Sequence, residues 1–328
     1  MTKTVDVHRD LLASADIAAA AQLACLLEVS AAKPGNVSPG RHFADACYEE
    51  FLASAVAIGG PLAGAGTRPL GATVRLAVEA TARWTRSNTN LGIVLLLAPL
   101  ARAAMLGSRV DDPTDCGMRI ADCGSRSEGG GPPWMGLRNA VRRVLEATTV
   151  DDARDVYAAI RLAAPGGLGR VDAQDVADEP DVTLLDAMRL AVDRDGIARE
   201  YATAYDRTFE TSVPALEDAR AAGLSWDDAV VETFLTLLAA APDTHVARRG
   251  GAVLAADILR RARAVRAAGG VRSTGGRRAL DDMDRSLREA GNVANPGTTA
   301  DLTAAAIFVV LLGGGWRITE GGGHAATR

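Results

Sequence analysis

The sequence predicts an all-α protein, and three observations support this fold class. About a dozen segments carry apolar residues at helical spacing. No run alternates apolar and polar residues with the β-branched enrichment that is typical of strands. Hydrophobic residues make up 48% of the 328 residues and aromatic residues only 4%, which predicts a large core of small aliphatic side chains. With no long linker and no internal repeat, we expect a single compact multi-helix domain of about a dozen helices.

The first predicted helix covers residues 14–32, with Ser14 or Asp16 as its cap. The turn Lys33-Pro34-Gly35-Asn36 ends it, because proline and glycine stop helices. Further helices are predicted at 48–58, 71–86, 91–106, 135–147 and 151–163, with an interruption at Gly59-Gly60-Pro61. Residues 91–106 are apolar nearly all round and should be central to the core. Residues 111–123 are expected to hold a short helix, and the Gly/Pro-rich loop 124–133 to be mobile.

The second half of the chain continues the helical pattern. Helices are predicted at 182–194, 196–208, 212–222, 225–241, 252–268, 280–290 and 299–312. The domain organisation is therefore a flexible N-terminus at 1–13, a helical domain at 14–313 and a flexible tail at 314–328.

Charge and cysteine content narrow the classes of partner. The net charge is −5, which offers no basic surface for nucleic acid. The longest apolar run, 91–105, is broken by Pro99 and Arg102 and is too short to span a bilayer. The four cysteines form no CxxC pair and residues 1–10 are polar and charged, so we expect free thiols and a cytoplasmic protein. A homodimer is an open alternative to a monomer.

Five polar joints stand out against the alanine-rich helices. They are residues 28–45, 88–92, 166–178, 243–251 and 295–301, and each lies at a predicted helix end. Up-and-down connections bring alternate joints to the same end of a helical bundle. We therefore expect all five joints to line one pocket with many backbone donors.

The joint at 243–251 carries the densest set of polar groups. Gly250 and Gly251 are placed at the start of the helix 252–268, where the backbone amides are free and the dipole is positive. Arg248 and Arg249 stand just ahead of that start, so the joint suits a phosphate. Asp243 adds a carboxylate for a metal ion or a proton. The alternative is a simple connector in which Asp243 is an N-cap.

Other candidates also have ordinary structural explanations. Glu28 could be a paired carboxylate on an apolar helix face, and Lys33 a surface lysine. Asn88 and Asn90 could be caps, and Asp301 a first-turn carboxylate favoured by the dipole. His42 and His245 lack the i, i+4 spacing of a metal pair, so a zinc site is not expected. The GxGxxG, GxxxxGK[ST] and GxSxG motifs are absent.

Four blocks of the sequence resemble the triphosphoribosyl-dephospho-CoA synthase family. The blocks are Glu28-Val29-Ser30 with Lys33-Pro34-Gly35-Asn36-Val37 and Phe51-Leu52-Ala53-Ser54-Ala55, then Asn88-Thr89-Asn90-Leu91-Gly92, then Asp243 to Gly251, and Asn295-Pro296-Gly297-Thr298-Thr299-Ala300-Asp301-Leu302. They occur in the family's order and span nearly the whole chain.

The resemblance implies an all-helical enzyme that moves the triphosphoribosyl part of ATP onto a ribose hydroxyl of dephospho-CoA and releases adenine. Such a reaction needs a carboxylate for the charge that develops on ribose, and cations, commonly including Mg²⁺, for the triphosphate. The expected partners are nucleotide and coenzyme-type small molecules. Together the joints and the resemblance give these candidates: catalytic Asp243, Glu28 and Asp45; substrate- or phosphate-binding Lys33, Pro34, Gly35, Asn36, Asn88, Thr89, Asn90, Arg170, Thr244, His245, Arg248, Arg249, Gly250, Gly251, Gly297, Thr298 and Thr299; and metal-binding Asp243 and Asp301.

The chain also departs from the family pattern. Asn90 and Leu91 stand where the family has His-Lys, and His245 replaces an asparagine. The Gly-rich turn at 165–172 is more similar to relatives associated with one-carbon, methanopterin-type cofactor synthesis. The acceptor is therefore open, and a non-catalytic nucleotide-binding protein is the rival from another class.

Overall fold

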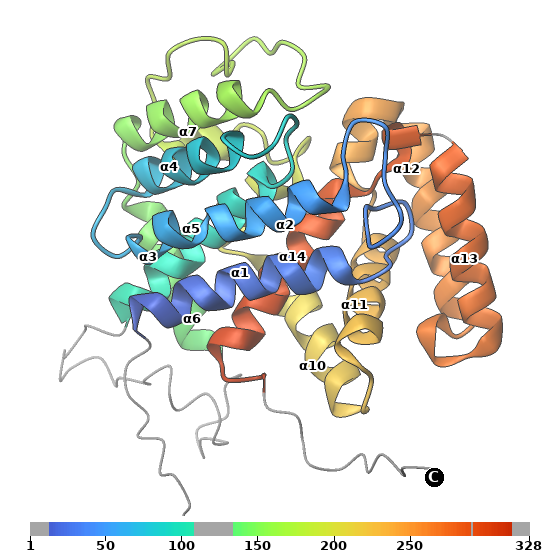
Figure 1. Cartoon of the computed structure of the whole chain (residues 1–328). Coiled ribbons are helices and arrows are strands. Elements are labelled where there is room, and N and C mark those ends of the chain that lie inside the picture. Colours follow the sequence, from blue (N-terminus) through green and yellow to red (C-terminus); the bar gives the residue numbers. More distant parts are fainter. Residues whose placement is uncertain (1–12, 108–133, 290, 317–328) are drawn as a thin grey trace, which may run out of the picture.

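The computed structural model describes residues 13–107, 134–289 and 291–316, and it confirms the all-α class (Figure 1). The predicted flexible N-terminus, the short helix at 111–123, the loop at 124–133 and most of the tail lie outside the described residues. Within the described residues, the only β-type pairings are two isolated bridges in the loop before α2. In chain order the helices are α1 Ser14–Ser30, α2 Tyr48–Ala57, α3 Gly59–Ala63, α4 Leu70–Ala82, α5 Leu91–Gly107, α6 Met135–Glu146, α7 Val150–Ala163, α8 Leu184–Arg189, α9 Gly196–Thr203, α10 Val213–Ala221, α11 Trp226–Ala240, α12 Thr244–Ala267, α13 Thr274–Glu289 and α14 Gly297–Leu312.

Helices α5 and α14 form the centre of the fold. Both are apolar around nearly their whole circumference, and most of their side chains are buried. In Figure 1, α14 runs through the middle of the molecule, and it packs against α1, α5, α10 and α11. The predicted central place of 91–106 is confirmed, because a helix without a polar face is stable only when neighbours surround it.

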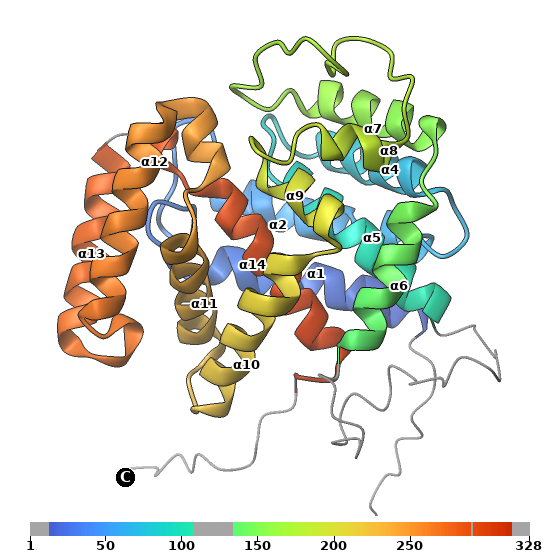
Figure 2. The same ribbon diagram turned by 180° about the vertical axis from the view of Figure 1, so that it is seen from behind.

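Two groups of helices flank this centre (Figures 1 and 2). On one side α4 packs on α7, and α6 packs on the central helix α5. On the other side α11 packs on α12, and α12 packs on α13. The N-terminal ends of α5, α9, α12 and α14 all contribute residues to the space between the two groups.

Several predicted boundaries were wrong. The interruption at 59–61 is the short helix α3, since Pro61 lies in its first turn, where its missing N–H costs nothing. The segment 182–194 is helical only over α8. The predicted helix 196–208 ends at Thr203, because Ala204 takes a left-handed φ of 50°. The helix predicted at 280–290 begins at Thr274, where the Ser273 hydroxyl accepts the Gly276 amide over 2.9 Å.

The joint before the predicted helix 252–268 is itself helical. α12 begins at Thr244, with Asp243 as its N-cap. Gly251 breaks it with φ 86° and ψ 163°, and the helical segment that follows runs from residue 252 to Ala267, close to the predicted 252–268. Such a conformation favours glycine. The two glycines therefore mark a kink inside α12.

Candidate active site

All five predicted joints contribute to one cavity of about 1100 Å³. The cavity lies among residues of α1, α5, α9, α12 and α14 and the turn after α7. Of the predicted site residues, those that line it are Glu28, Asn36, Asp45, Asn88, Thr89, Asn90, Thr244, His245, Arg248, Arg249, Gly297, Thr298 and Asp301. Those that do not are Lys33, Pro34, Gly35, Arg170, Asp243, Gly250, Gly251 and Thr299.

Lys33 lies behind the wall of the cavity and is paired with a residue that lines it. Its Nζ is 2.9 Å from Glu28 Oε1, and the lysine side chain is 0% exposed. The same ammonium donates hydrogen bonds to the backbone oxygens of Glu28 and Ala31. The alternative explanation of Lys33 as a surface lysine is therefore wrong. A buried ion pair with satisfied donors fixes the Glu28 carboxylate in place at the end of α1.

Pro34 and Gly35 shape the turn that presents Asn36. Gly35 has φ 75°, and its amide donates to Asp284 of α13 over 2.8 Å. Asp284 also pairs with Arg288, which donates to the Asn36 backbone oxygen. The side-chain oxygen of Asn36 is buried and has no partner among the described residues. The turn thus leaves one acceptor available at the cavity wall.

Asp243 joins two helix starts. One carboxylate oxygen accepts the Val246 amide over 3.0 Å, and the other accepts both the amide and the hydroxyl of Thr299 at 2.7 Å. Asp243 is 2% exposed. The cap interpretation is therefore confirmed for α12, and the same side chain also caps α14. These three hydrogen bonds tie the α12 and α14 joints together behind the cavity.

The segment 88–90 closes the start of α5. Asn88 Oδ1 accepts the Leu91 amide over 3.0 Å, as the cap interpretation predicts. Asn90 is buried and donates to Thr81 Oγ1 over 3.1 Å. Thr89 shares a hydrogen bond with the hydroxyl of Ser54. All three residues line the cavity, and their side chains also hold α2, α4 and α5 together.

The first turns of α12 bring His245, Arg248 and Arg249 to the cavity. His245 Nδ1 lies 3.1 Å from the Asn295 backbone oxygen, and a Cβ on Gly297 would fall 2.4 Å from that nitrogen. Glycine at 297 therefore allows the two joints to meet. Burial lowers the pKa of His245, as do Arg248 and Arg249, whereas the charge of Asp243 opposes this.

Asp301 is a carboxyl group of the cavity wall that has no partner among the described residues. It lies in the first turn of α14, and its Oδ2 is 2.0 Å from the position that a Cβ on Gly92 would take. No described residue forms a hydrogen bond or ion pair with it. Burial and the charges of Glu28, Asp243 and Asp195 raise its pKa well above the usual range, whereas Arg248 opposes this.

Several arginines of the cavity were missed by the sequence analysis. Arg86, Arg194, Arg199 and Arg207 line it together with Arg248 and Arg249. Arg248 pairs with Asp195 at 2.9 Å, and Arg199 pairs with Asp206 at 3.1 Å. The guanidinium groups of Arg194, Arg207 and Arg249 form no hydrogen bond or ion pair with described residues. The predicted helix boundary at Asp195-Gly196 was the one sequence feature that could have indicated that this region, with Arg194 and Arg199, lies at the cavity.

Two predicted residues have other surroundings. Arg170 is exposed outside the cavity and pairs with Asp175 at 3.3 Å. Asp45 is exposed at the cavity rim, where Asn292 donates to both of its oxygens at 3.0 and 3.1 Å. Asp45 thereby links the loop after α1 to the loop before α14.

The donor set limits how a metal ion could bind. Among the described residues, no group of three or more His, Cys, Asp or Glu side chains is placed to hold a metal ion. Glu28 and Asp301 supply carboxylate oxygens, which suit Mg²⁺ when substrate phosphates complete its shell.

Nowhere in the described ranges is a helix long and apolar enough to cross a membrane.

The fold and the site define an all-α protein with a cavity at its helix ends that is lined by arginine and carboxyl side chains. The model of the ATP:dephospho-CoA triphosphoribosyl transferase family matches residues 14–320. The chain belongs to this family.

Relatives by sequence and by structure agree with this assignment. A protein of Pseudomonas paraeruginosa, "Probable 2-(5''-triphosphoribosyl)-3'-dephosphocoenzyme-A synthase", is 38% identical over 125 residues, which are 37% of this chain and 42% of the relative. A Pseudomonas putida protein of the same name is 36% identical over 115 residues, 35% of this chain and 40% of the relative. A solved structure, "Crystal structure of putative triphosphoribosyl-dephospho-coA synthase from Archaeoglobus fulgidus", matches with TM-score 0.57 and 27% identity, over 81% of this chain and all of that one.

Proposed function

We propose that the chain transfers the triphosphoribosyl group of ATP to a hydroxyl of a coenzyme precursor and releases adenine. The observation that carries this proposal is the composition of the cavity. It combines a fixed carboxylate, Glu28, and a partnerless one, Asp301, with the unpaired guanidinium groups of Arg207 and Arg249. Carboxylates suit the charge that develops on ribose, and guanidinium groups suit phosphates.

Glu28 is the proposed catalytic carboxylate. As the ribose–adenine bond breaks, positive charge grows on the ribose, and a fixed carboxylate stabilises it without reorganising. The same group can accept the proton of the attacking hydroxyl. The ion pair with Lys33 keeps Glu28 oriented during both events. Asp45, at the rim, is proposed to contact the acceptor.

The triphosphate is proposed to bind the arginines and the joints around them. Arg248, Arg249 and His245 come from α12, and Thr298 from the start of α14. Asn36, Asn88, Thr89 and Asn90 are proposed to contact the nucleoside part. Mg²⁺, when bound, would share the phosphate charge, with Asp301 as its protein ligand. Asp243 is proposed to contribute only indirectly, by holding the starts of α12 and α14 in place, because its oxygens already accept three hydrogen bonds.

The acceptor is the least constrained part of the proposal. Gly166, Leu168 and Val176 of the Gly-rich segment after α7 line the cavity together with Met188 and Val192. This apolar wall can contact an extended coenzyme precursor, either dephospho-CoA or a precursor of a methanopterin-type cofactor. A panel of both acceptor types with labelled ATP would identify the one that forms a product.

Adenine release tests the proposal directly. Purified protein, ATP, Mg²⁺ and dephospho-CoA are incubated, and free adenine is measured against protein-free controls. Glu28→Gln should lower the rate by roughly two to four orders of magnitude while leaving ATP binding measurable. Arg189→Ala, on an exposed arginine outside the cavity, should not change it. Binding of ATP without adenine release under any acceptor would favour the non-catalytic alternative.

A further inference from the structure

A sharp bend after α9 determines where Arg207 lies. Ala204 and Tyr205 have φ values of 50° and 63°, an unusual conformation for residues other than glycine. The Tyr205 hydroxyl donates to the Leu96 oxygen over 2.8 Å, and Arg138 donates to the Ala204 oxygen over 3.1 Å. The bend is therefore held from both sides by helices α5 and α6. Strained backbone that its surroundings enforce is common at functional sites.

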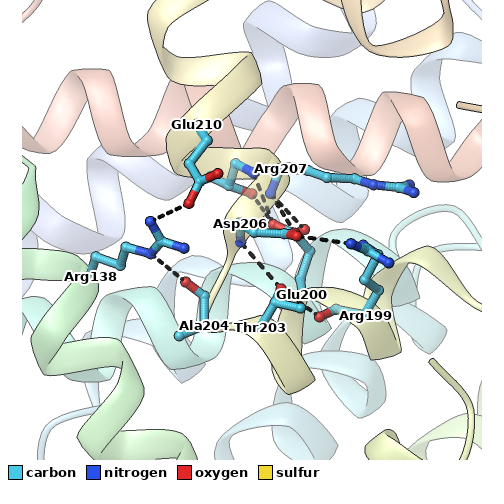
Figure 3. A network of polar contacts seen from close by, with 9 residues as sticks. Arg138, Arg199, Glu200, Thr203, Ala204, Asp206, Arg207 and Glu210 are labelled. Carbon is cyan, nitrogen blue, oxygen red and sulfur yellow. Dashed lines mark hydrogen bonds and ion pairs between the residues drawn. The ribbon is translucent and has the colours of Figure 1, made fainter. Parts of the chain in front are cut away.

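The buried carboxylate of Glu200 fixes the chain immediately after the bend. It accepts the amide of Arg207 at 3.2 Å, the amide of Thr208 at 3.0 Å and the hydroxyl of Thr208 at 2.6 Å. Glu200 is 0% exposed. A π-helical turn, η2 (Thr208–Ser212), follows before α10 begins. Figure 3 shows the Glu200 carboxylate next to the backbone of Arg207, with the contacts drawn as dashed lines.

The side chain of Arg207 extends away from this network. In Figure 3, Arg138 and Arg199 point their guanidinium groups at partners, whereas that of Arg207 has none drawn. Arg138 pairs with Glu210 at 2.7 Å and Arg199 with Asp206 at 3.1 Å. Arg207 lines the cavity and forms no hydrogen bond or ion pair with a described residue. A guanidinium group held in a pocket without a counter-ion suits an anionic ligand.

Arg207 reaches the start of α14. Its Nη1 lies 3.8 Å from the position that a Cβ on Gly196 would take, and the Thr298 methyl and Thr244 Oγ1 lie 2.8 and 3.4 Å from the same point. Thr244 Oγ1 donates to Thr298 Oγ1 over 3.1 Å, so the Thr298 hydroxyl keeps its own hydrogen to donate. The positive end of the α14 dipole lies at the same place. The Arg207 guanidinium group, together with the Thr298 hydroxyl and the helix end of α14 from a distant part of the chain, therefore favours an anion there.

We propose that Arg207 binds a phosphate of the substrate and that Glu200 positions it through the backbone. The identity of the substrate rests on the proposed function, but the phosphate chemistry does not. The phosphate could belong to the triphosphate of ATP or to the diphosphate of the acceptor. Comparing how tightly ATP and the acceptor bind to variants of Arg207 distinguishes the two sources.

The test measures binding of four probes by calorimetry: inorganic tripolyphosphate, ATP, adenosine and dephospho-CoA. Arg207→Ala should weaken tripolyphosphate and ATP by at least about tenfold and leave adenosine unchanged. The affinity of Arg207→Lys for tripolyphosphate and ATP should lie between those of the wild type and Arg207→Ala. Lysine keeps the positive charge but lacks the planar guanidinium group that can donate two parallel hydrogen bonds. Arg189→Ala removes an arginine outside the cavity and is the matched control. If Arg207→Ala does not fold, Arg207→Gln, which keeps two of the three methylene groups of arginine, is used in its place.

The positioning role has its own measurement. Glu200→Gln should weaken tripolyphosphate in the wild-type background and have no further effect in the Arg207→Ala background. Equal weakening in both backgrounds would show a general structural role and overturn the positioning part.

The outcomes separate this inference from the proposed function. Weakening of dephospho-CoA alone would support the phosphate site and assign it to the acceptor. Unchanged binding of all phosphate probes by a folded Arg207 variant would overturn the inference, even if the wild type releases adenine. Loss of tripolyphosphate binding in a protein that never releases adenine would support the inference and contradict the proposed function. A wild type that binds none of the phosphate probes would overturn both.

Discussion

The Tyr201 hydroxyl donates a hydrogen bond to the backbone oxygen of Leu95 over 2.8 Å. Leu95 lies four residues before Pro99 inside α5, so the proline leaves this oxygen without its helical donor. The tyrosine of α9 replaces the missing N–H and thereby joins α9 to the central helix. Burial raises the pKa of Tyr201, so the hydroxyl keeps its proton at all ordinary pH values.

Tyr201→Phe is expected to destabilise the protein by ~1–3 kcal/mol, because it leaves the buried Leu95 oxygen unsatisfied. Tyr205→Phe is the matched control: its hydroxyl donates to Leu96, whose oxygen keeps the regular donor at Leu100. Urea unfolding of both variants measures the difference. A Tyr205→Phe variant that loses as much stability as Tyr201→Phe would contradict this explanation.

Lys33→Met is expected to cost ~3–5 kcal/mol, since it leaves the Glu28 carboxylate buried without its counter-ion. Glu28→Gln combined with Lys33→Met should recover part of that stability, because no lone charge remains. Denaturant unfolding of the two single variants and the double variant gives the coupling. Additive losses would show that the pair is not coupled.

Gly92→Ala is expected to displace Asp301, because the new methyl group would overlap its carboxylate. Adenine release should fall by on the order of a hundredfold, as for other misplaced site groups. Gly60→Ala in α3 meets nothing within 4 Å and should instead stabilise the protein by up to ~1 kcal/mol. Unchanged adenine release by Gly92→Ala would separate Asp301 from the reaction.

Asp243→Asn is expected to lower stability by ~1–3 kcal/mol, because one amide oxygen cannot replace two carboxylate oxygens that accept three hydrogen bonds. Melting curves of the variant test the role of Asp243 as a helix cap, and adenine release tests a role in catalysis. If Asp243→Asn is as stable as the wild type but no longer releases adenine, Asp243 takes part in the reaction.

Glu200 should make stability depend on pH. Burial raises its pKa from 4.5 to about 7, although the Thr208 hydrogen bonds oppose this rise. Between these values the folded state holds a proton that the unfolded chain releases, so stability falls as pH rises from 4.5 to about 7. The shift corresponds to ~3 kcal/mol. Glu200→Gln removes this titration. The free energy of unfolding of the variant, measured relative to that of the wild type, should therefore rise by ~3 kcal/mol between pH 4.5 and pH 8.

The sequence by itself determined the all-α class, the central place of α5 and the five joints. These follow from local signals: helical periodicity, the apolar stretch at 91–106, and the Pro, Gly and Asn residues that end helices. The joints proved to line one cavity, because each lies at a helix end and helix ends meet in a compact helical domain.

Only the tertiary structure decided which side chains face that cavity. Lys33 lies behind its wall because Glu28 provides a buried partner, and Asp243 caps two helices because Thr299 comes within reach of it. Arg207 enters the cavity because the chain turns at Ala204, where no glycine signals a bend. The hydrogen bond that helps hold this turn joins Tyr205 to Leu96, 109 residues away, and a contact of that range leaves no trace in local sequence.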